Sequence, residues 1–266
     1  CKNAMSKNNE VSFIDLTQII SVQNSKEVLN SIKFEYLIQD YWTTTRNNSF
    51  TKVIQQTTQN IVELDSILKF KDAGINYQRV KVGLSQKGKS DLSSRLLYEG
   101  EKESKNDVEF WKGVDINSFF ISEHTSRFCR TNITLREGER VILNEDYFNI
   151  SPKLIWRQTA PYPICTIDYN GVWFGRSIQA GLIRPEYQNT ISYEYLCGIL
   201  NSKCIRDVYE QNVKEGGRVF PQVKLEKLKP LPIVIPTPEE RKIVEDLVKQ
   251  IIDLKSKSKN ADELEE

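Results

Sequence analysis

Two apolar segments of this sequence close on polar side chains that could read DNA. The first segment ends in Arg157, Gln158 and Thr159, and the second, which is rich in aromatic residues, ends in Arg176 and Ser177. Arginine can donate two hydrogen bonds to guanine, glutamine can bond adenine in the same bidentate way, and serine or threonine can bond a phosphate or a base. If the two segments are adjacent strands, we expect these five residues to contact DNA where the strand ends enter a groove.

Each of these residues also has a structural interpretation. Arg157 or Arg176 could pair with a carboxylate such as Asp168, and Gln158 could simply cap a strand. Contacts to phosphates outnumber contacts to bases in protein–DNA complexes, so residue type alone does not establish base reading. The sequence leaves both interpretations open.

Two glycine-containing basic segments supply further candidates. Lys81, Lys87 and Lys89 lie in a segment predicted to be a flexible loop, and Lys214 and Arg218 flank the two glycines of a second turn. Glycine lets the backbone approach a phosphate or a base edge closely. We predict that Lys81, Lys87 and Lys89 bind DNA phosphates, each adding about one unit to the salt dependence of binding, and that the turn with Lys214 and Arg218 approaches a phosphate or a base edge.

The positive charge of the chain is local, because the net charge is only +1. Lysine and arginine outnumber aspartate and glutamate by seven to two in residues 69–95, by four to one in 153–184 and by seven to four in 203–229. Any one of these segments could be an ordinary solvated surface. A fold that brings all three together would create one positive face suited to nucleic acid.

The motifs of common catalytic sites are absent from the sequence. It has no glycine-rich nucleotide loop, no nucleophile elbow and no pair of metal-binding histidines, since His124 is the only histidine. Asp91, Glu103 and Lys105 have the spacing of a nuclease site in which two carboxylates hold Mg²⁺. Because Glu103 and Lys105 stand in a charged segment without a strand pattern, a solvated loop is the preferred interpretation. We expect no enzymatic activity, no metal and no cofactor in this chain alone.

The composition predicts a soluble, cytoplasmic protein with reduced thiols. No apolar run approaches the roughly 18 residues that a membrane-spanning helix needs, and no signal-peptide pattern opens the chain. The five cysteines are an odd number at scattered spacings, which does not fit a disulfide framework.

The elements that must position the candidate residues are many short strands and a few helices. Between residues 61 and 187, short apolar runs such as 61–70 alternate with turn residues, and a hairpin turn is predicted at 168–171. One helix is predicted over 191–213, followed by a return to extended structure. The predicted fold class is therefore α+β, a mixed domain of many short twisted strands with a few helices that ends in an amphipathic helix.

The last helix is predicted over residues 237–257. Thr237 and Glu240 form a capping box with proline at the first helical position. Its apolar seam should face protein, either the surface of this domain or a partner. The seam comprises Val244, Leu247, Ile251 and Leu254.

Five segments stand in the order found in a known family. They are the entry turn Ala73–Ile75, then Lys112–Ile116, Pro152–Gln158, Leu196–Ser202 and Leu225–Ile233. In this order they resemble the TaqI-like C-terminal specificity domain. That domain is the target-recognition part of type IIG restriction–modification enzymes and of related DNA adenine-N6 methyltransferases. The resemblance covers residues 61–255.

The resemblance implies sequence-specific recognition of duplex DNA, in defence against foreign DNA. The intact parent would hold its site over a methyltransferase that flips adenine out of the stack, and it could also be an endonuclease. The parent's catalytic and cofactor motifs are missing here, so S-adenosylmethionine, and Mg²⁺ if the parent cleaves, would belong to another part. Half of a type I specificity subunit is one alternative, and a protein-interaction module that dimerises through the last helix is another.

The resemblance also divides the chain. Residues 1–8 are a tag or disordered, and 9–60 are a linker or the tail of a preceding methyltransferase domain. Residues 61–236 are the recognition domain, 237–257 the amphipathic helix and 258–266 a charged tail. The expected partners are duplex DNA and a missing methyltransferase domain or partner subunit packed on the last helix, with no membrane contact.

Overall fold

The computed structural model describes residues 60–71, 74–79, 86–212 and 221–257. These belong to one unit of the chain, Thr57–Glu266. The segments predicted over 1–59 and the charged tail 258–266 lie outside the described residues, so those predictions stay predictions.

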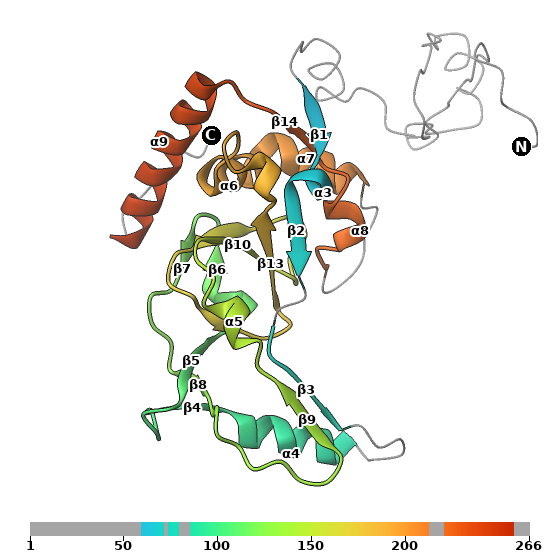
Figure 1. The fold of residues 1–266 in the computed structure, drawn as a ribbon, viewed down its shortest axis with the longest axis vertical. Coiled ribbons are helices and arrows are strands. Elements are labelled where there is room, and N and C mark those ends of the chain that lie inside the picture. Colours follow the sequence, from blue (N-terminus) through green and yellow to red (C-terminus); the bar gives the residue numbers. More distant parts are fainter. Residues whose placement is uncertain (1–59, 72–73, 80–85, 213–220, 258–266) are drawn as a thin grey trace, which may run out of the picture. The chain divides into compact units, whose positions relative to one another are not determined.

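A four-stranded antiparallel sheet forms the centre of this unit (Figure 1). Its strand order is β11 (Cys165–Asp168), β10 (Lys153–Arg157), β13 (Ile178–Ile183) and β2 (Leu68–Lys71). The first four residues of β10 are all buried, which explains why this strand reads as a continuous apolar run rather than an alternating one. β2 lies at one edge of the sheet.

A second sheet has the order β12 (Trp173–Phe174), β5 (Val108–Trp111), β8 (Arg127–Cys129) and β4 (Leu97–Glu99). The hairpin predicted at 168–171 is wrong, because β11 pairs with β10 whereas β12 pairs in parallel with β5. A turn does exist there: the Asp168 carboxylate accepts hydrogen bonds from three successive backbone N–H groups. That turn passes the chain from the first sheet to the second.

Smaller elements extend from these sheets. β3 (Asn76–Arg79) pairs with β9 (Glu139–Ile142), and α4 (Gln86–Leu96) contacts β3. Figure 1 shows these three elements together, away from the C-terminal helices. Four more short elements complete this part of the unit. They are η3 (Gly113–Asp115), β6 (Ile116–Asn117), β7 (Phe120–Ile121) and α5 (Glu145–Phe148).

The strand predicted over 61–70 is interrupted by a helical turn. β1 (Ile61–Glu63) is followed by α3 (Leu64–Ile67) before β2 begins. β1 pairs with β14 (Pro232–Val234), which follows the short helix α8 (Leu225–Leu228). Leu64 and Ile67 are therefore buried in a helical turn rather than in a strand.

The helix predicted over 191–213 is two helices, α6 (Tyr193–Asn201) and α7 (Lys203–Asn212). Ser202 separates them in an extended conformation, and its hydroxyl accepts a hydrogen bond from the backbone N–H of Ile205. The short 3₁₀ turn η4 (Pro185–Tyr187) precedes α6. The break follows from the tendency of serine to bond the backbone at the start of a helix rather than inside one.

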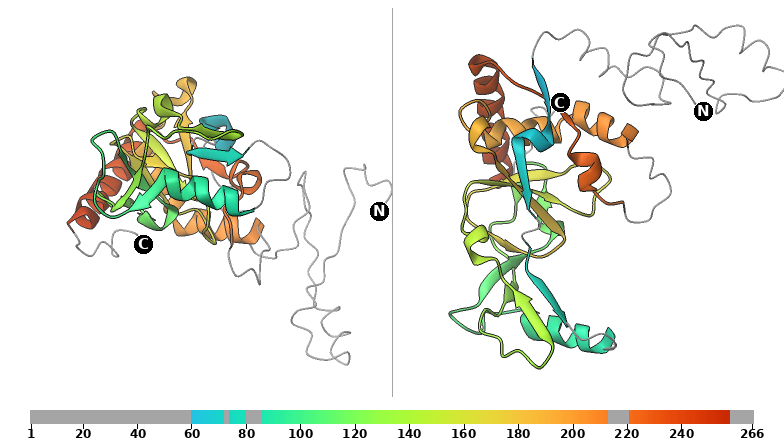
Figure 2. Two further views of the ribbon diagram at one scale, coloured as in Figure 1. Left: turned by 90° about the horizontal axis from the view of Figure 1, so that it is seen from below. Right: turned by 45° about the vertical axis from the view of Figure 1, so that its right-hand side comes forward.

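The last helix, α9 (Pro238–Ser256), begins with the predicted capping box of Thr237 and Glu240. It packs on α6 (Figures 1 and 2), where a Cβ on Gly198 would lie 2.9 Å from methyl groups of Val244 and Val248. The predicted seam is only partly correct. Ile251 is buried, but Leu247 is 36% exposed and Val248 takes its place in the contact.

The mixed α/β class predicted from the sequence is confirmed, with many short strands and a C-terminal helix. Within the described ranges, no helix is long and apolar enough to cross a membrane. Cys129, Cys165 and Cys197 are buried and unpaired, and Cys204 is exposed.

Candidate nucleic-acid interface

The pairing of β10 with β13 brings the two predicted strand ends together. Arg157 lies opposite Ile178, and the backbone N–H of Gln158 donates to the carbonyl of Ser177 over 2.9 Å. Arg176 and Ser177, the second candidate pair, lie just before the first residue of β13. They were predicted to lie at the end of a strand instead. The five residues predicted to contact DNA therefore lie at one end of the central sheet.

Arg157 uses its guanidinium group within the protein. Nε donates to the carbonyl of Gly113 at 2.6 Å, and Nη2 donates to the carbonyl of Val114 at 3.2 Å. The suggested ion pair with Asp168 is wrong, because that carboxylate pairs with Lys153. Arg157 instead supports the backbone of η3.

Ser177 supports the same turn from the other side. Its hydroxyl oxygen accepts a hydrogen bond of 3.0 Å from the backbone N–H of Gly113. A Cβ at Gly113 would lie 2.8 Å from the backbone oxygen of Ser177, so the close approach requires glycine. Arg157 and Ser177 thus act on one turn that neither segment contains.

The side chains of Gln158 and Thr159, unlike that of Arg157, are not used to support another segment of the described structure. The Gln158 carbonyl accepts from the N–H of Val223, and Thr159 forms an isolated bridge with Gln222, so both backbones are fixed. Within the described part of the chain, neither side chain makes a hydrogen bond. Thr159 is exposed and Gln158 is half-buried. Both remain available to a ligand.

Arg176 is exposed, and among the described residues its side chain makes one hydrogen bond, of 2.8 Å from Nη2 to Oδ1 of Asn76. The contact depends on a close approach of two glycines, because a Cβ on Gly74 would lie 2.7 Å from the carbonyl carbon of Gly175. The remaining guanidinium N–H groups of Arg176 can donate to another molecule.

The lysine candidates are placed differently from the strand-end residues. Lys87 and Lys89 lie in α4, so the prediction that they belong to a flexible loop is wrong for the backbone. Lys81, Lys214 and Arg218 lie outside the described residues. Their proposed phosphate contacts stay predictions.

The positive surface is smaller than the segment charges suggest. Lys153 is completely buried and paired with Asp168, and the Arg184 guanidinium donates to the backbone carbonyl of Asp65. Lys69 and Lys71, in contrast, are exposed on the edge strand β2. Only some of the basic residues in the three segments could therefore contact a DNA phosphate.

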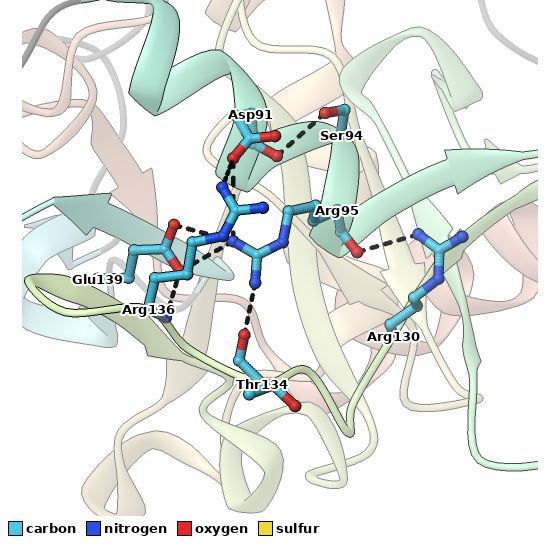
Figure 3. Close-up of polar contacts among 7 residues, drawn as sticks. All are labelled: Asp91, Ser94, Arg95, Arg130, Thr134, Arg136 and Glu139. Carbon is cyan, nitrogen blue, oxygen red and sulfur yellow. Dashed lines mark hydrogen bonds and ion pairs between the residues drawn. The ribbon is translucent and has the colours of Figure 1, made fainter.

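An arginine cluster occupies the region of the nuclease-like triplet (Figure 3). Asp91, on α4, pairs with Arg136, while Arg95 on the same helix donates to both oxygens of Glu139 at 2.9 and 3.0 Å. Arg95 also donates to the carbonyl of Thr134 at 2.5 Å. These bonds join α4 to β9 and to the segment before it.

Glu103 belongs to a separate contact. It pairs with Arg130 at 2.7 Å, and Arg130 also donates to the backbone carbonyl of Arg95. Among the residues with described positions, no group of three histidine, cysteine or carboxylate side chains could hold a metal ion. Asp91 and Glu103 each form an ion pair with an arginine, and the two carboxylates take part in separate contacts.

The feature that residue types did not reveal is η3 itself. The segment Lys112–Ile116 was recognised as part of a family pattern, but it has no side chain of the kinds that suggest DNA reading at its tip. The structure shows Val114 exposed there, with the turn closed by the carboxylate of Asp115 bonded to the N–H of Lys112. The signal in the sequence was the pair Gly113 and Asp115, two residues apart, because glycine and aspartate are both typical of tight turns.

Comparisons with solved structures give low similarity. The chain matches the type I restriction–modification S subunit from M. genitalium with 16% identity and a TM-score of 0.37 over 81% of this chain and 45% of that chain. The HsdS subunit from Thermoanaerobacter tengcongensis matches with 12% identity and a TM-score of 0.39, over 77% and 41%. A third match, in a study of assembly and conformational transition of the type I R-M system, has 13% identity and a TM-score of 0.39, over 77% and 42%. The chain thus spans less than half the length of these structures.

No curated protein matches the chain significantly. A family model does match, over residues 108–233, which run from β5 into β14 and include η3, β10 and β13. The match confirms the resemblance read from the sequence, to the TaqI-like C-terminal specificity domain.

Proposed function

We propose that this domain recognises a specific sequence in duplex DNA, as the target-recognition part of a larger restriction–modification protein. One observation carries the proposal. The segment that matches the specificity-domain family contains a sheet end where Gln158, Thr159 and Arg176 present free hydrogen-bonding groups on a fixed backbone.

The chemistry of these groups suits base recognition. A glutamine amide can bond adenine, and the free N–H groups of an arginine can bond guanine or a phosphate. A groove that receives this sheet end could contact several of them.

The parent protein remains a proposal of its own. We infer a DNA adenine-N6 methyltransferase whose catalytic part binds S-adenosylmethionine and lies outside this chain, with half of a type I specificity subunit as the alternative. The dimerising module is less well supported, because the apolar face of α9 packs on α6 of the same chain. The exposed Ile243 leaves room for a contact with the missing catalytic part.

The first test is a binding series with the chain and random-sequence duplexes at increasing salt. Non-specific binding should fall in the range of about 10⁻⁴ to 10⁻⁶ M and weaken steeply with salt. Repeated selection from the same pool should enrich one sequence motif. A chain that retains no duplex at low salt contradicts the proposal.

The second test uses two variants in that selection. Arg176→Ala should reduce discrimination at one base pair by about 1–3 kcal/mol if the arginine is bidentate to a base. Lys105→Ala, in an exposed loop away from the sheet end, is the matched control and should change neither preference nor affinity. Equal motifs from both variants would show that Arg176 does not read a base.

A third test addresses catalysis. The chain should incorporate no label into the selected duplex from radiolabelled S-adenosylmethionine. Incorporation above background would contradict the proposed division between recognition and methyl transfer.

A further inference from the structure

The tip of η3 carries an apolar side chain that the domain does not bury. Val114 is 68% exposed, whereas Trp111 and Ile116 on either side belong to the core. A valine at this exposure contributes almost nothing to the hydrophobic stabilisation of the fold. It lies within the segment that matches the specificity-domain family.

The backbone beneath Val114 is fixed by side chains from two other elements. Arg157 donates to the carbonyls of Gly113 and Val114 at 2.6 and 3.2 Å, and the hydroxyl of Ser177 accepts from the N–H of Gly113 at 3.0 Å. Arg157 and Ser177 were candidates for DNA contacts, but in the structure their side chains hold the backbone of this turn.

The Asp115 side chain closes the same turn. Its carboxylate accepts from the backbone N–H of Lys112 at 2.7 Å and pairs with Arg127 on β8. The carbonyl of Asp115 accepts from the N–H of Ser122 at 3.2 Å. The turn is therefore anchored to β8, to the end of β10 and to the segment before β13, and only its tip is free.

A rigid turn with a free apolar tip is suited to a contact with another molecule. Pre-organisation lowers the entropy that binding costs, and functional residues often stand on loops fixed by a rigid scaffold. Protein interfaces are commonly organised around larger anchors such as tryptophan, tyrosine or arginine. A single isopropyl group is smaller than such an anchor and fits a DNA groove better, where apolar side chains contact the 5-methyl group of thymine.

We propose, resting on the DNA-recognition function proposed above, that the turn Lys112–Asp115 determines specificity at one base pair. Val114 contacts a thymine methyl group, and Arg157 and Ser177 are positioning residues that act through the turn. Arg157 then reads no base itself, because its donors are engaged with backbone carbonyls.

The test begins with selection of a preferred duplex by the full chain. Val114→Ala should lose preference at one A·T pair of the selected motif and leave the others unchanged. Leu135→Ala is the matched control, since Leu135 is also an exposed aliphatic side chain, 43% exposed, but lies on a different loop. It should select the wild-type motif.

A base substitution then locates the contact. Uracil lacks the 5-methyl group of thymine, so replacing the contacted thymine should weaken binding by the wild-type chain about fourfold, the factor expected for one buried methyl group. Val114→Ala should bind the thymine and uracil duplexes equally, because the methyl contact is already lost. Thymine-to-uracil changes elsewhere in the motif should affect both chains alike.

Arg157 variants separate positioning from charge. Arg157→Met should lose preference at the same base pair as Val114→Ala, with the salt dependence of binding unchanged. Arg157→Lys should not restore that preference, because one ammonium group does not replace the two-armed guanidinium. Arg184→Met, which removes another arginine bonded to a backbone carbonyl, controls for a general loss of stability and should keep the motif.

The outcomes distinguish this inference from the function on which it rests. A wild-type chain that selects no motif overturns both. A wild-type chain that selects a motif, together with a Val114→Ala variant that keeps every preference and the same uracil response, overturns only the role of the turn. If Arg157→Lys restores the preference and Arg157→Met flattens the salt dependence, Arg157 contacts a phosphate and the positioning role is wrong.

Discussion

The two main charged clusters of this domain join similar residues in opposite environments. Lys153 and Asp168 lie in the central sheet with both side chains completely buried and 2.5 Å apart. Asp91 and Arg136, beside α4, are 41% and 54% exposed. The first ion pair is shielded from water and the second is open to it, so the two pairs should have very different effects on stability.

The buried cluster is fully satisfied by its surroundings. The ammonium of Lys153 also donates to the carbonyls of Phe148 and Ile150 at 2.8 and 2.9 Å. The Asp168 carboxylate accepts three backbone N–H groups from the turn that follows it. This network fixes the passage from the first sheet to the second, whereas the α4 cluster only holds a peripheral helix in place.

Breaking the buried cluster should have the largest effect. Lys153→Met leaves the Asp168 charge buried without its partner, which should lower the free energy of unfolding by about 3–5 kcal/mol. Urea denaturation followed by circular dichroism measures the change. Lys112→Met is the matched control, because Lys112 forms an exposed pair with Glu99 at 3.3 Å and should change stability by less than about 1 kcal/mol. Equal effects of the two variants would show that burial does not separate these pairs.

The intermediate effect should come from Glu139, which lies inside the α4 cluster. Its side chain has no exposed surface and accepts from Arg95 and from the backbone N–H of Arg136. Glu139→Gln should weaken the docking of α4 by about 1.5–3 kcal/mol, the range for hydrogen bonds to charged groups. Hydrogen exchange of the α4 amides measures this local loss.

Glu123→Gln is the control for that exchange experiment, since Glu123 is exposed. It should leave the α4 amides as protected as in the wild type. If Glu139→Gln instead raises exchange throughout the central sheet, the cluster is part of the main cooperative unit rather than a local clamp.

The pH dependence of α4 should follow the same carboxyl group. Burial by itself raises the pKa of Glu139, but the backbone N–H of Arg136 and the Arg95 guanidinium outweigh it and hold that pKa below its usual value. A lowered pKa in the folded state means that the stabilisation is present above the unfolded pKa of about 4.3 and is lost as the pH falls through the folded value. Protection of the α4 amides, taken relative to the intrinsic exchange rate at each pH, should therefore fall below about pH 4 in the wild type.

The Glu139→Gln variant provides the control for this pH series. Its α4 amides should already exchange quickly near neutral pH and should lack the additional acid-induced step. Persistence of the full step in the variant would assign it to another carboxyl group.

Sequence reasoning located the strand end at Arg157 but not what Arg157 does there. The apolar run before it could be read as a strand because Leu154, Ile155 and Trp156 are consecutive large apolar residues. Its partners could not be read, because the carbonyls of Gly113 and Val114 are 44 and 43 residues away and a backbone carbonyl leaves no signature in residue type. The same limit explains the wrong hairpin at 168–171. The turn was predicted correctly from its local residues, but the strand that follows it pairs with β5, which the local sequence does not show.

Helix boundaries show a related limit. The capping box at Thr237 was predictable because all of its bonds are local. The choice of Val248 over Leu247 on the inner face of α9 was not, because it depends on the space left by Gly198 on another helix. Local chemistry could therefore be read from the sequence, while contacts between distant segments could not.

The smallest effect should come from Asp91, the residue whose spacing suggested a nuclease. It pairs with Arg136 and lies 4.0 Å from Arg95, with much of its carboxylate in water. Asp91→Asn should therefore lower the free energy of unfolding by only about 0.2–1 kcal/mol, and 1 M salt should remove most of that difference because it screens exposed charges. Adding Mg²⁺ should not shift the melting temperature of the wild type relative to the variant. A shift seen only with Asp91 present would place a metal site where the structure shows an arginine-paired carboxylate, and the contrast between the two clusters would no longer be one of burial alone.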